Sequence, residues 1–290
     1  MALSSKRFRM QPSQGCDAGS SPAGAAIMNL KWIIQNNLGK TDNASKIAMF
    51  LEAQGVEWQE ISIIPFDESP IEGVDTDGIK IFYGSTGLTR RVFDAQKWTP
   101  GVFFDPAKFC YEAALQGYGE NLVNADSEVV TVGEFLKRDY PDDELFFTRP
   151  SEDSKIFTGA LMFFHEMKAW KRVLEGSTER FTFDSKIQVA APKVIVRETR
   201  HFIVNGKVSA SSNYGHGLMK YEVEQRDIDY ANEMAKLYQP ADVFTLDTCR
   251  LEDESMRMVE TNCFNSSGLY WSDVYNLTRD INQFLREKYG

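Results

Sequence analysis

Apolar and polar residues follow a regular order along the first half of the chain. Short apolar runs predict strands at residues 30–37, 60–64 and 79–83, with a candidate fourth at 102–104. After the first run, an apolar stripe through Ile47, Phe50 and Leu51 predicts a helix over residues 43–54. Strands that alternate with helices are typical of parallel sheets, so we predict a small α/β domain over residues 28–125.

The second half is richer in strand-like runs with turns between them. We predict strands at residues 145–148, 155–157, 186–189, 194–204, 207–212, 243–249 and 256–262. Helical patterns cover residues 161–175 and 225–238. Thr131 and Glu134, three residues apart, have the spacing of a capping box and predict a helix start within residues 130–138. Together these elements predict an antiparallel α+β domain over residues 126–290.

The dipeptide Asn205-Gly206 is the clearest local signal in this half. Both central residues of a type I′ turn need a positive φ, which Asn and Gly adopt more readily than other residues. The dipeptide therefore predicts a hairpin that pairs residues 194–204 with residues 207–212.

Composition narrows the range of functions. The chain has 290 residues, 42% of them hydrophobic, and a net charge of -10. The negative charge disfavours a phosphate backbone, so we expect no nucleic-acid partner, whereas one nucleotide needs only a few local cations and a metal ion. No apolar run reaches the roughly 18 residues that span a bilayer, so we expect no membrane insertion. The oligomeric state stays open.

Cysteine and histidine usage favours a reducing compartment and argues against zinc chemistry. The four cysteines form no C-x-x-C pair, and we expect Cys249 and Cys263 to be small core residues. The three histidines lack the spacing of metal ligands. Residues 1–27 lack the apolar segment of a signal peptide, so we expect a flexible tail or leader and a cytoplasmic location.

Two carboxylates and a carboxamide are predicted to converge near the end of the chain. Residues two apart in a strand share a face, so Glu260 and Asn262 point the same way. If the acidic turn centres near Asp253, Asp247 lies almost opposite Glu260. Such a set of hard oxygen atoms suits Mg²⁺, with phosphate oxygens and water as further ligands. An ordinary polar hairpin face is the alternative that the spacing leaves open.

A second segment places a cation on each side of a polar turn. Arg149 and Lys155 flank the run Pro-Ser-Glu-Asp-Ser, and a hairpin of this kind could fold over a triphosphate. The segment has no Walker-type glycine pattern, so a P-loop fold is not indicated. A solvated hairpin tip is the alternative.

Charged residues also interrupt the apolar strand predicted at residues 194–204. Glu198 and Arg200 share one face of this strand, where they need partners or a ligand to offset the loss of water. A structural Glu-Arg pair is the alternative. His201 falls on the opposite face, and we expect it to be a packed or surface residue.

These three segments, in this order, resemble the ATP-grasp superfamily and in particular its clade named for two arginines and a lysine. The resemblance covers roughly residues 130–270. Arg149 stands where other ATP-grasp enzymes usually have a lysine before a glycine-rich loop, which is a departure from the wider superfamily. The resemblance implies an ATP-grasp fold, with two α+β subdomains that clasp ATP and a small α/β domain before them.

The resemblance also implies a role for each matching residue. Mg²⁺ and ATP are the expected cofactors, with Asp247, Glu260 and Asn262 as metal ligands and Arg200 and Arg149 as the catalytic cations. ATP is expected to contact the following residues, of which three belong to a linker near residues 190–195: Arg149, Lys155, Lys193, Val194, Ile195 and Glu198.

The implied reaction is the ATP-dependent ligation of a carboxylate to an amine through an acyl-phosphate. The substrates could be small molecules or peptides, and neither the run Tyr83-Gly84-Ser85 nor residues 265–270 identify them. A non-ligating regulatory or kinase-like protein of the same fold is one alternative. A protein-interaction module with acidic faces is another.

Overall fold

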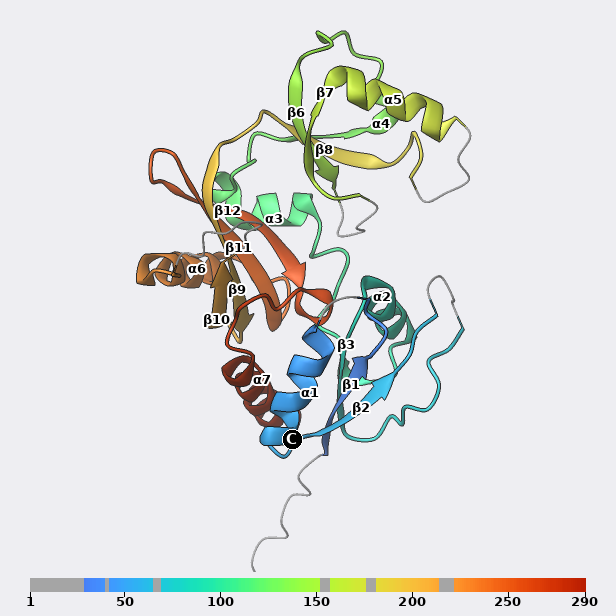
Figure 1. Cartoon of the computed structure of the whole chain (residues 1–290), viewed down its shortest axis with the longest axis vertical. Coiled ribbons are helices and arrows are strands. Elements are labelled where there is room, and N and C mark those ends of the chain that lie inside the picture. Colours follow the sequence, from blue (N-terminus) through green and yellow to red (C-terminus); the bar gives the residue numbers. More distant parts are fainter. Residues whose placement is uncertain (1–28, 40–41, 65–68, 152–156, 176–180, 214–221) are drawn as a thin grey trace, which may run out of the picture.

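The computed structural model describes residues 29–39, 42–64, 69–151, 157–175, 181–213 and 222–290 (Figure 1). Within these residues the strands form three sheets of four strands each. No helix in these ranges is both long enough and apolar enough to span a bilayer.

The first sheet is parallel, as the sequence predicts, and has the order β2-β1-β3-β4. Its strands are β1 (Leu30–Gln35), β2 (Glu57–Ile61), β3 (Ile79–Tyr83) and β4 (Thr99–Gly101). The helices are α1 (Asn43–Ala53) and α2 (Thr86–Ala95), and α2 has no counterpart among the sequence predictions. β2 and β4 both begin three residues earlier than predicted. The prediction followed the apolar runs, whereas the strand ends are set by the pairing of β2 with β1 and of β4 with β3.

The second sheet is antiparallel with the order β5-β8-β6-β7. It contains β5 (Glu128–Thr131), β6 (Leu145–Pro150), β7 (Ala160–Phe163) and β8 (Lys186–Ala190), with helices α4 (Val132–Phe135) and α5 (Phe164–Leu174). Its apolar core is formed by residues that include Val132, Phe135, Phe164, Met167 and Ile187.

One sequence prediction in this region is wrong at its start, and a second can be checked at one residue only. Residues 161–163 of the helix predicted at 161–175 belong to strand β7 instead, because they pair with β6, with Leu161 opposite Phe147; the helix begins at Phe164. Phe157 lies outside any strand, and residues 155 and 156 of the predicted strand lie outside the described residues. The Thr131 and Glu134 capping box is confirmed, although the helix that it begins is only four residues long.

The third sheet is also antiparallel, with the order β10-β9-β11-β12. Its strands are β9 (Ile195–Val204), β10 (Lys207–Asn213), β11 (Val243–Leu251) and β12 (Met256–Cys263). Asn205 and Gly206 join β9 to β10 with φ values of 48° and 75°, which confirms the predicted hairpin. Cys249 and Cys263 are buried free cysteines, as expected.

Helices cover both faces of the third sheet. Residues of α3 (Tyr111–Tyr118) and α6 (Gln225–Leu237) share one apolar core with Ile203 and Leu246. The opposite face packs against α7 (Val274–Tyr289) and against the first sheet. Short 3-10 turns, η1 (Gly119–Asn121) and η2 (Phe264–Ser266), complete the elements.

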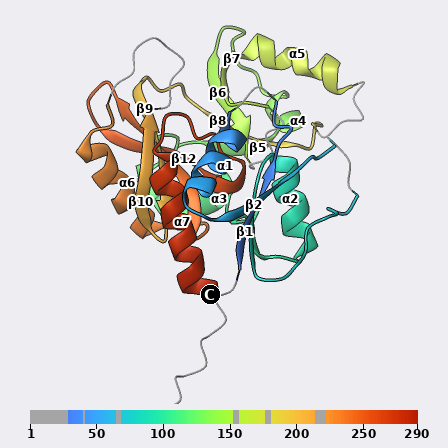
Figure 2. The same ribbon diagram turned by 60° about the horizontal axis from the view of Figure 1, so that its bottom comes forward.

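The first and third sheets share one continuous core through α7. Trp32 of β1, Leu51 of α1, Phe202 of β9 and Ile281 of α7 all belong to this core. The indole Nε1 of Trp32 also donates a buried hydrogen bond of 2.8 Å to Oδ1 of Asn282. Figures 1 and 2 both show α7 beside α1. The domain boundary between residues 125 and 126 stays a prediction.

Candidate nucleotide and metal site

Six polar residues converge where the second and third sheets approach each other. We call them the candidate-site cluster: Arg149, Glu198, Arg200, Asp247, Glu260 and Asn262. In the strand pairing, Asp247 lies opposite both Glu260 and Arg200, so the predicted register is confirmed. The side chain of Asn262 donates to Oε1 of Glu260 at 2.8 Å and to Oδ2 of Asp247 at 3.5 Å.

Arg200 and Asp247 form a buried, two-pronged ion pair. Nε of Arg200 donates to Oδ1 of Asp247 at 2.9 Å, and Nη2 donates to Oδ2 at 2.7 Å. The exposed fractions are 4% for Arg200 and 0% for Asp247. Burial raises the pKa of Asp247, and the charge of Arg200 only partly offsets this effect. Asp247 is therefore a carboxylate that gains from further positive charge.

Arg149 links the two antiparallel sheets. It projects from β6 of the second sheet and forms an ion pair with Glu260 on β12 of the third. Burial acts to raise the pKa of Glu260, but the charge of Arg149 and the hydrogen bond from Asn262 bring it below its usual value. The candidate site thus takes a cation from one sheet and carboxylates from the other.

Glu198 adds a third carboxyl group to the same face. Burial, followed by the negative charges of Asp247 and Glu260, raises the pKa of Glu198 to about 8. The candidate-site cluster holds three carboxyl groups against two guanidinium groups, so it can accommodate additional positive charge.

The donor set fits a hard divalent cation. Carboxylate and carboxamide oxygens are the ligands that Mg²⁺ takes from proteins, usually one or two carboxylates with phosphate oxygens and water. Over the described ranges, no three His, Cys, Asp or Glu side chains are placed to hold a metal ion by themselves. Asp247, Glu260 and Asn262 could therefore hold such an ion only together with oxygen atoms from a nucleotide or water.

The other residues predicted to contact ATP lie in or next to the connection between β8 and β9, or outside the described residues. Val194 is the last residue of the connection between β8 and β9, and Ile195 is the first residue of β9; both apolar side chains are exposed. Nζ of Lys193 instead binds the carboxylate of Asp126, at 2.8 and 3.1 Å, and no described contact joins Lys193 to the candidate-site cluster. Lys155 lies outside the described residues.

A segment that the sequence left ambiguous borders Arg200. The guanidinium of Arg200 lies 5.2 Å from the ring centre of Tyr270, and its Nη1 donates to the carbonyl oxygen of Gly268 at 3.4 Å. The hydroxyl of Tyr83 donates to the carbonyl of Ser267 at 2.6 Å. The run of small polar residues after β12 is the sequence signal that could have indicated this contact with the end of β3.

Asn265 ties the same segment to the first sheet. Its side-chain amide donates to the carbonyl of Phe82 at 2.6 Å, and its Oδ1 accepts from the backbone N–H of Phe103 at 2.7 Å. The backbone N–H of Gly84 donates to the carbonyl of Asn265 at 2.8 Å. A Cβ at Gly84 would lie 2.7 Å from Gln35, so a larger residue would disturb this junction.

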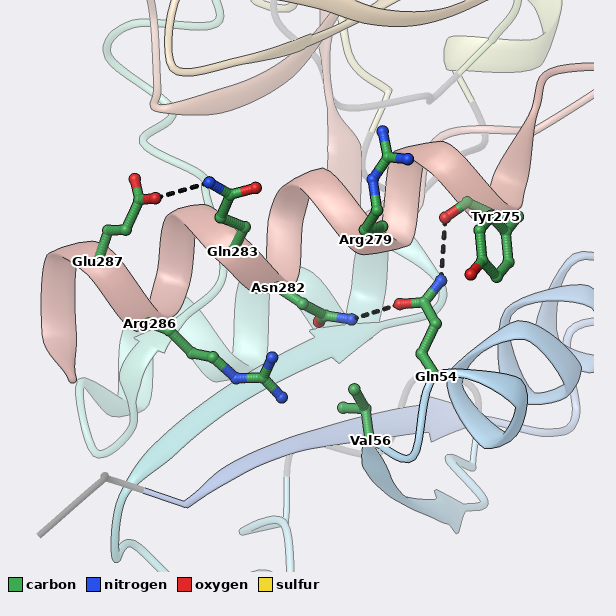
Figure 3. A pocket seen from close by; sticks show the side chains of 8 residues that line it. All are labelled: Gln54, Val56, Tyr275, Arg279, Asn282, Gln283, Arg286 and Glu287. Atoms are coloured by element: carbon green, nitrogen blue, oxygen red, sulfur yellow. Dashed lines mark hydrogen bonds between the residues drawn. The ribbon is translucent and has the colours of Figure 1, made fainter.

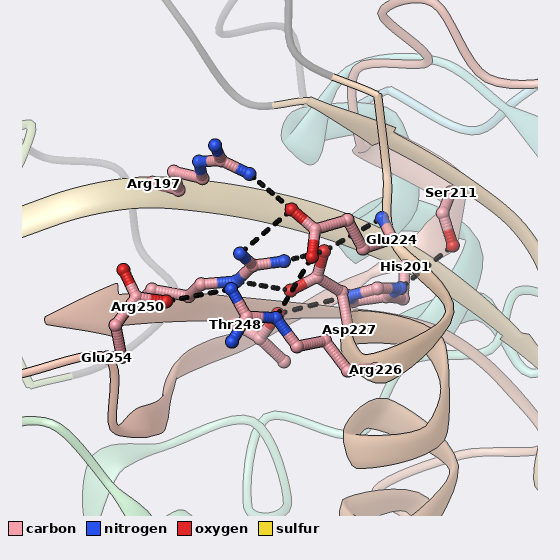
Figure 4. Close-up of polar contacts among 9 residues, drawn as sticks. All are labelled: Arg197, His201, Ser211, Glu224, Arg226, Asp227, Thr248, Arg250 and Glu254. Carbon is pink, nitrogen blue, oxygen red and sulfur yellow. Dashed lines mark hydrogen bonds and ion pairs between the residues drawn. The ribbon is translucent and has the colours of Figure 1, made fainter.

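A second charged cluster lies on the other face of the third sheet (Figure 4). We call it the α6 cluster: Arg197, Glu224, Arg226, Asp227, Arg250 and Glu254. Arg250 binds Asp227 through two hydrogen bonds of 2.9 and 2.7 Å. Glu224, which precedes α6, accepts from Arg197 at 2.6 Å, Arg226 at 3.0 Å and Arg250 at 3.0 Å.

His201 lies beside the α6 cluster, on the face opposite Arg200. Its ring nitrogens contact Oγ of Ser211 at 2.8 Å and Oγ1 of Thr248 at 3.0 Å. The side chain is fully buried, and burial lowers the pKa of His201 to about 3. Of the two expectations for His201, a packed or a surface residue, the structure shows the packed one.

The two antiparallel sheets, with cations and carboxylates where they approach each other, agree with the arrangement that the resemblance to the ATP-grasp class implies. Residues 72–286 match the family model described as an ATP-grasp domain, family 3 of the clade named for two arginines and a lysine, so the chain belongs to that family. The predicted family and fold class are thereby confirmed.

Solved structures of ATP-grasp proteins share the fold at low sequence identity. The ligase PsnB, complexed with precursor peptide PsnA2 and AMPPNP, is 13% identical with a TM-score of 0.56, covering 91% of this chain and 100% of its own. D-cycloserine synthetase DcsG is 15% identical with a TM-score of 0.55, covering 90% and 100%.

D-alanine--D-alanine ligase from Bacillus anthracis, complexed with ATP, is 11% identical with a TM-score of 0.54, covering 91% and 100%. No curated protein matches the chain in sequence.

Proposed function

We propose that the protein is an ATP-dependent ligase that joins a carboxylate to an amine. The observation that carries the proposal is the convergence of Arg200, Asp247, Glu260 and Asn262 from three strands with Arg149 from the facing sheet. Membership of the ATP-grasp family and bound ATP, ADP or AMPPNP in the similar structures support the same function.

Asp247, Glu260 and Asn262 would hold Mg²⁺ beside the nucleotide phosphates. The ion would offset the negative charge of the transferring phosphoryl group. Asn262 already donates to Glu260, so it orients that carboxylate on the shared strand face. The raised pKa of Asp247 fits a carboxylate that gains from a nearby cation.

Arg149 and Arg200 would position the reacting groups. A carboxylate oxygen of the first substrate attacks the γ-phosphorus, the bond from that phosphorus to the ADP oxygen breaks, and an acyl-phosphate forms. The substrate amine then attacks the acyl carbon, phosphate leaves with its bonding electrons, and the nitrogen loses a proton. Both steps depend on positioning and charge stabilisation, which two guanidinium groups supply without a side-chain nucleophile.

Arg149 and Arg200 are suited to different tasks. Arg200 is fixed by two hydrogen bonds to a fully buried carboxylate, so it offers a rigid cation. The side chains of Arg149 and Glu260 are 24% and 21% exposed, so this pair is the easier one to rearrange. We infer that phosphate takes the place of Glu260 as the partner of Arg149 when the nucleotide binds.

The proposal is tested first by nucleotide binding. Calorimetry should detect ATP binding that depends on Mg²⁺, and Asp247→Asn should abolish this dependence. A protein-interaction module of the same fold would show no Mg²⁺-dependent binding at millimolar ATP, and that result would overturn the proposal.

The second test separates a ligase from a kinase-like protein. Hydroxylamine traps acyl-phosphates as hydroxamates, so the protein, Mg-ATP and a panel of carboxylates should yield hydroxamate and ADP. A phosphorylated alcohol instead of a hydroxamate would favour the kinase-like alternative. Mass spectrometry of the products distinguishes the two.

A further inference from the structure

Arg200 has a second neighbour besides Asp247 that restricts its guanidinium group. The guanidinium carbon lies over the ring of Tyr270, 5.2 Å from the ring centre. An aromatic face attracts a guanidinium group and limits the directions in which that group can turn. Asp247 holds one edge of the guanidinium group through Nε and Nη2, and the ring covers one of its faces. The two neighbours therefore restrict Arg200 along different directions.

The backbone of Tyr270 adopts an unusual conformation for its residue type. Its φ is 48°, in the left-handed region that bulky side chains rarely enter. Within the described residues, Tyr270 is the only aromatic residue with a positive φ. Such conformations cost free energy, persist only where the surroundings hold them, and cluster at functional sites. Glycine or asparagine would adopt this backbone more easily, but neither would supply a ring over Arg200.

Neighbouring residues hold Tyr270 from both sides. A Cβ at Gly268 would lie 3.3 Å from the ring of Tyr270, so glycine leaves the space in which the ring lies. On the other side, the backbone N–H of Trp271 donates to Oγ of Ser212 at 3.0 Å. Ser212 lies directly opposite Arg200 in the pairing of β10 with β9. The segment that carries Tyr270 is thus fixed to the strand pair that carries Arg200.

The remaining edge of the guanidinium group points towards this segment. Nη1 of Arg200 donates to the carbonyl oxygen of Gly268 at 3.4 Å, whereas the two hydrogen bonds to Asp247 are 2.9 and 2.7 Å long. A hydrogen bond of 3.4 Å is long and therefore weak, and a charged phosphoryl oxygen is a stronger acceptor than a carbonyl. Nη1 is therefore the donor that a phosphoryl group can recruit, provided that the guanidinium group keeps its orientation.

Resting on the proposed ligase function, we propose that Tyr270 is a positioning residue for Arg200. Its ring keeps the guanidinium group in the orientation in which Nη1 donates to the transferring phosphoryl group. Tyr270 itself takes no part in making or breaking bonds. A misplacement of about 1 Å near the reacting atoms can lower a rate about 100-fold. Loss of the ring should therefore slow turnover far more than it weakens nucleotide binding.

Two substitutions separate the ring of Tyr270 from its backbone. Tyr270→Phe keeps the ring, whereas Tyr270→Asn removes it and retains a residue type that tolerates a positive φ. Turnover is measured as ADP release with Mg-ATP, hydroxylamine and the carboxylate that yields most hydroxamate. Tyr270→Asn should lower kcat about 10- to 100-fold and change the Kd for Mg-ATP by less than about twofold. Tyr270→Phe should retain the kcat of the unchanged protein.

Tyr275→Asn is the matched control. Tyr270 and Tyr275 are similarly exposed, at 38% and 43%, and Tyr275 lines a hollow of about 580 Å³ between the end of α1 and α7 (Figure 3). Gln54 donates to the backbone carbonyl of Tyr275, which the substitution retains. No ring contact or hydrogen bond in the described part of the chain joins Tyr275 to Arg200. This variant should keep its turnover, and a loss as large as that of Tyr270→Asn would overturn the inference.

A second measurement reports on Arg200 without turnover. In protein labelled with ¹⁵N-arginine, the Nε–H signal of Arg200 is assigned through its loss in Arg200→Lys. Exchange of this proton with water should be about tenfold faster in Tyr270→Asn, because the ring no longer covers the guanidinium group. Tyr270→Phe should leave the exchange rate unchanged.

The outcomes separate this inference from the proposed function. Turnover and proton exchange in Tyr270→Asn that equal those of the unchanged protein would overturn the inference, as would equal losses of turnover in Tyr270→Asn and Tyr270→Phe. A Kd for Mg-ATP that rises as much as kcat falls would also overturn it, since the ring would then support nucleotide binding. Absence of Mg²⁺-dependent ATP binding would remove the ligase proposal, while the exchange rates would still test whether Tyr270 holds Arg200.

Discussion

The two faces of the third sheet carry charged clusters of similar composition and opposite character. In the α6 cluster, three carboxylates meet three guanidinium groups, and hydrogen bonding by Arg250 lowers the pKa of Glu224 to about 2. In the candidate-site cluster, three carboxyl groups meet two guanidinium groups, and the pKa of Glu198 rises to about 8 because of burial and its acidic neighbours.

We propose that the α6 cluster holds the fold together, whereas the candidate-site cluster binds a ligand. Matched charges fix α6 to β9 and β11 and need nothing further. Buried carboxyl groups that lie close together raise one another's pKa, and a bound cation would favour their charged forms. Perturbed pKa values of this kind are common at functional sites, although structural networks also produce them.

The largest effect on stability is expected from Arg250→Leu. This change leaves Asp227 buried without its main partner, and breaking a buried ion pair in this way costs about 3–5 kcal/mol. Urea denaturation should show a loss of this size, while Mg-ATP still stabilises the folded variant. A loss below about 1 kcal/mol would contradict the structural role of the α6 cluster.

Glu260→Gln tests the candidate-site cluster on the other face of the third sheet. Removing one negative charge from the proposed metal ligands should lower turnover about 100-fold, equivalent to about 2.7 kcal/mol of barrier. Because the pair with Arg149 is partly exposed, the free energy of unfolding without nucleotide should change by less than about 1 kcal/mol. Coupled detection of ADP release and urea denaturation measure the two quantities. Equal losses in both would show that Glu260 is structural.

The pH dependence of stability should reveal His201. The unfolded state binds a proton near pH 6.5, whereas the folded His201, with its pKa of about 3, stays neutral. Stability from this residue is therefore present above pH 6.5 and is lost as the pH falls towards 3. Between pH 6.5 and 5.0 the unchanged protein should lose about 1.5 kcal/mol more than His201→Asn. Parallel urea titrations at the two pH values provide the check, and equal losses would refute the assignment.

The smallest effect is expected from Arg197→Gln. Arg197 and Glu224 form an ion pair whose side chains are about 40% exposed, and such pairs are worth about 0.2–1 kcal/mol. A loss of stability as large as that of Arg250→Leu would mean that the exposed pair Arg197–Glu224 and the buried pair Arg250–Asp227 act as one unit. Adding salt should reduce the effect further.

Local patterns in the sequence account for much of the third sheet. The turn near Asp253 and the two-residue period of a strand place Asp247 almost opposite Glu260, and a shift in register between Asp247 and Thr248 brings the two residues opposite each other. Asn205 and Gly206 likewise determine the hairpin between β9 and β10. These features depend only on neighbours along the chain, so a single sequence can reveal them.

Contacts between distant elements could not be predicted in this way. Residues 160–163 form a strand only because β6 lies beside them. The pairing of Arg149 with Glu260 depends on how two sheets approach, and Lys193 binds Asp126 rather than the candidate-site cluster. The apolar stripe of α7, at Leu277, Ile281 and Leu285, is present in the sequence, but its partner β1 lies about 250 residues away.

The contact between β1 and α7 determines which parts of the protein can unfold separately. The core that joins Trp32 to Ile281 belongs to neither sheet alone, so the first and third sheets should unfold as one cooperative unit. The second sheet has an apolar core of its own and is the part that can open separately. Amide hydrogen exchange should then give β1 and β11 one common opening free energy and give β8 a lower one.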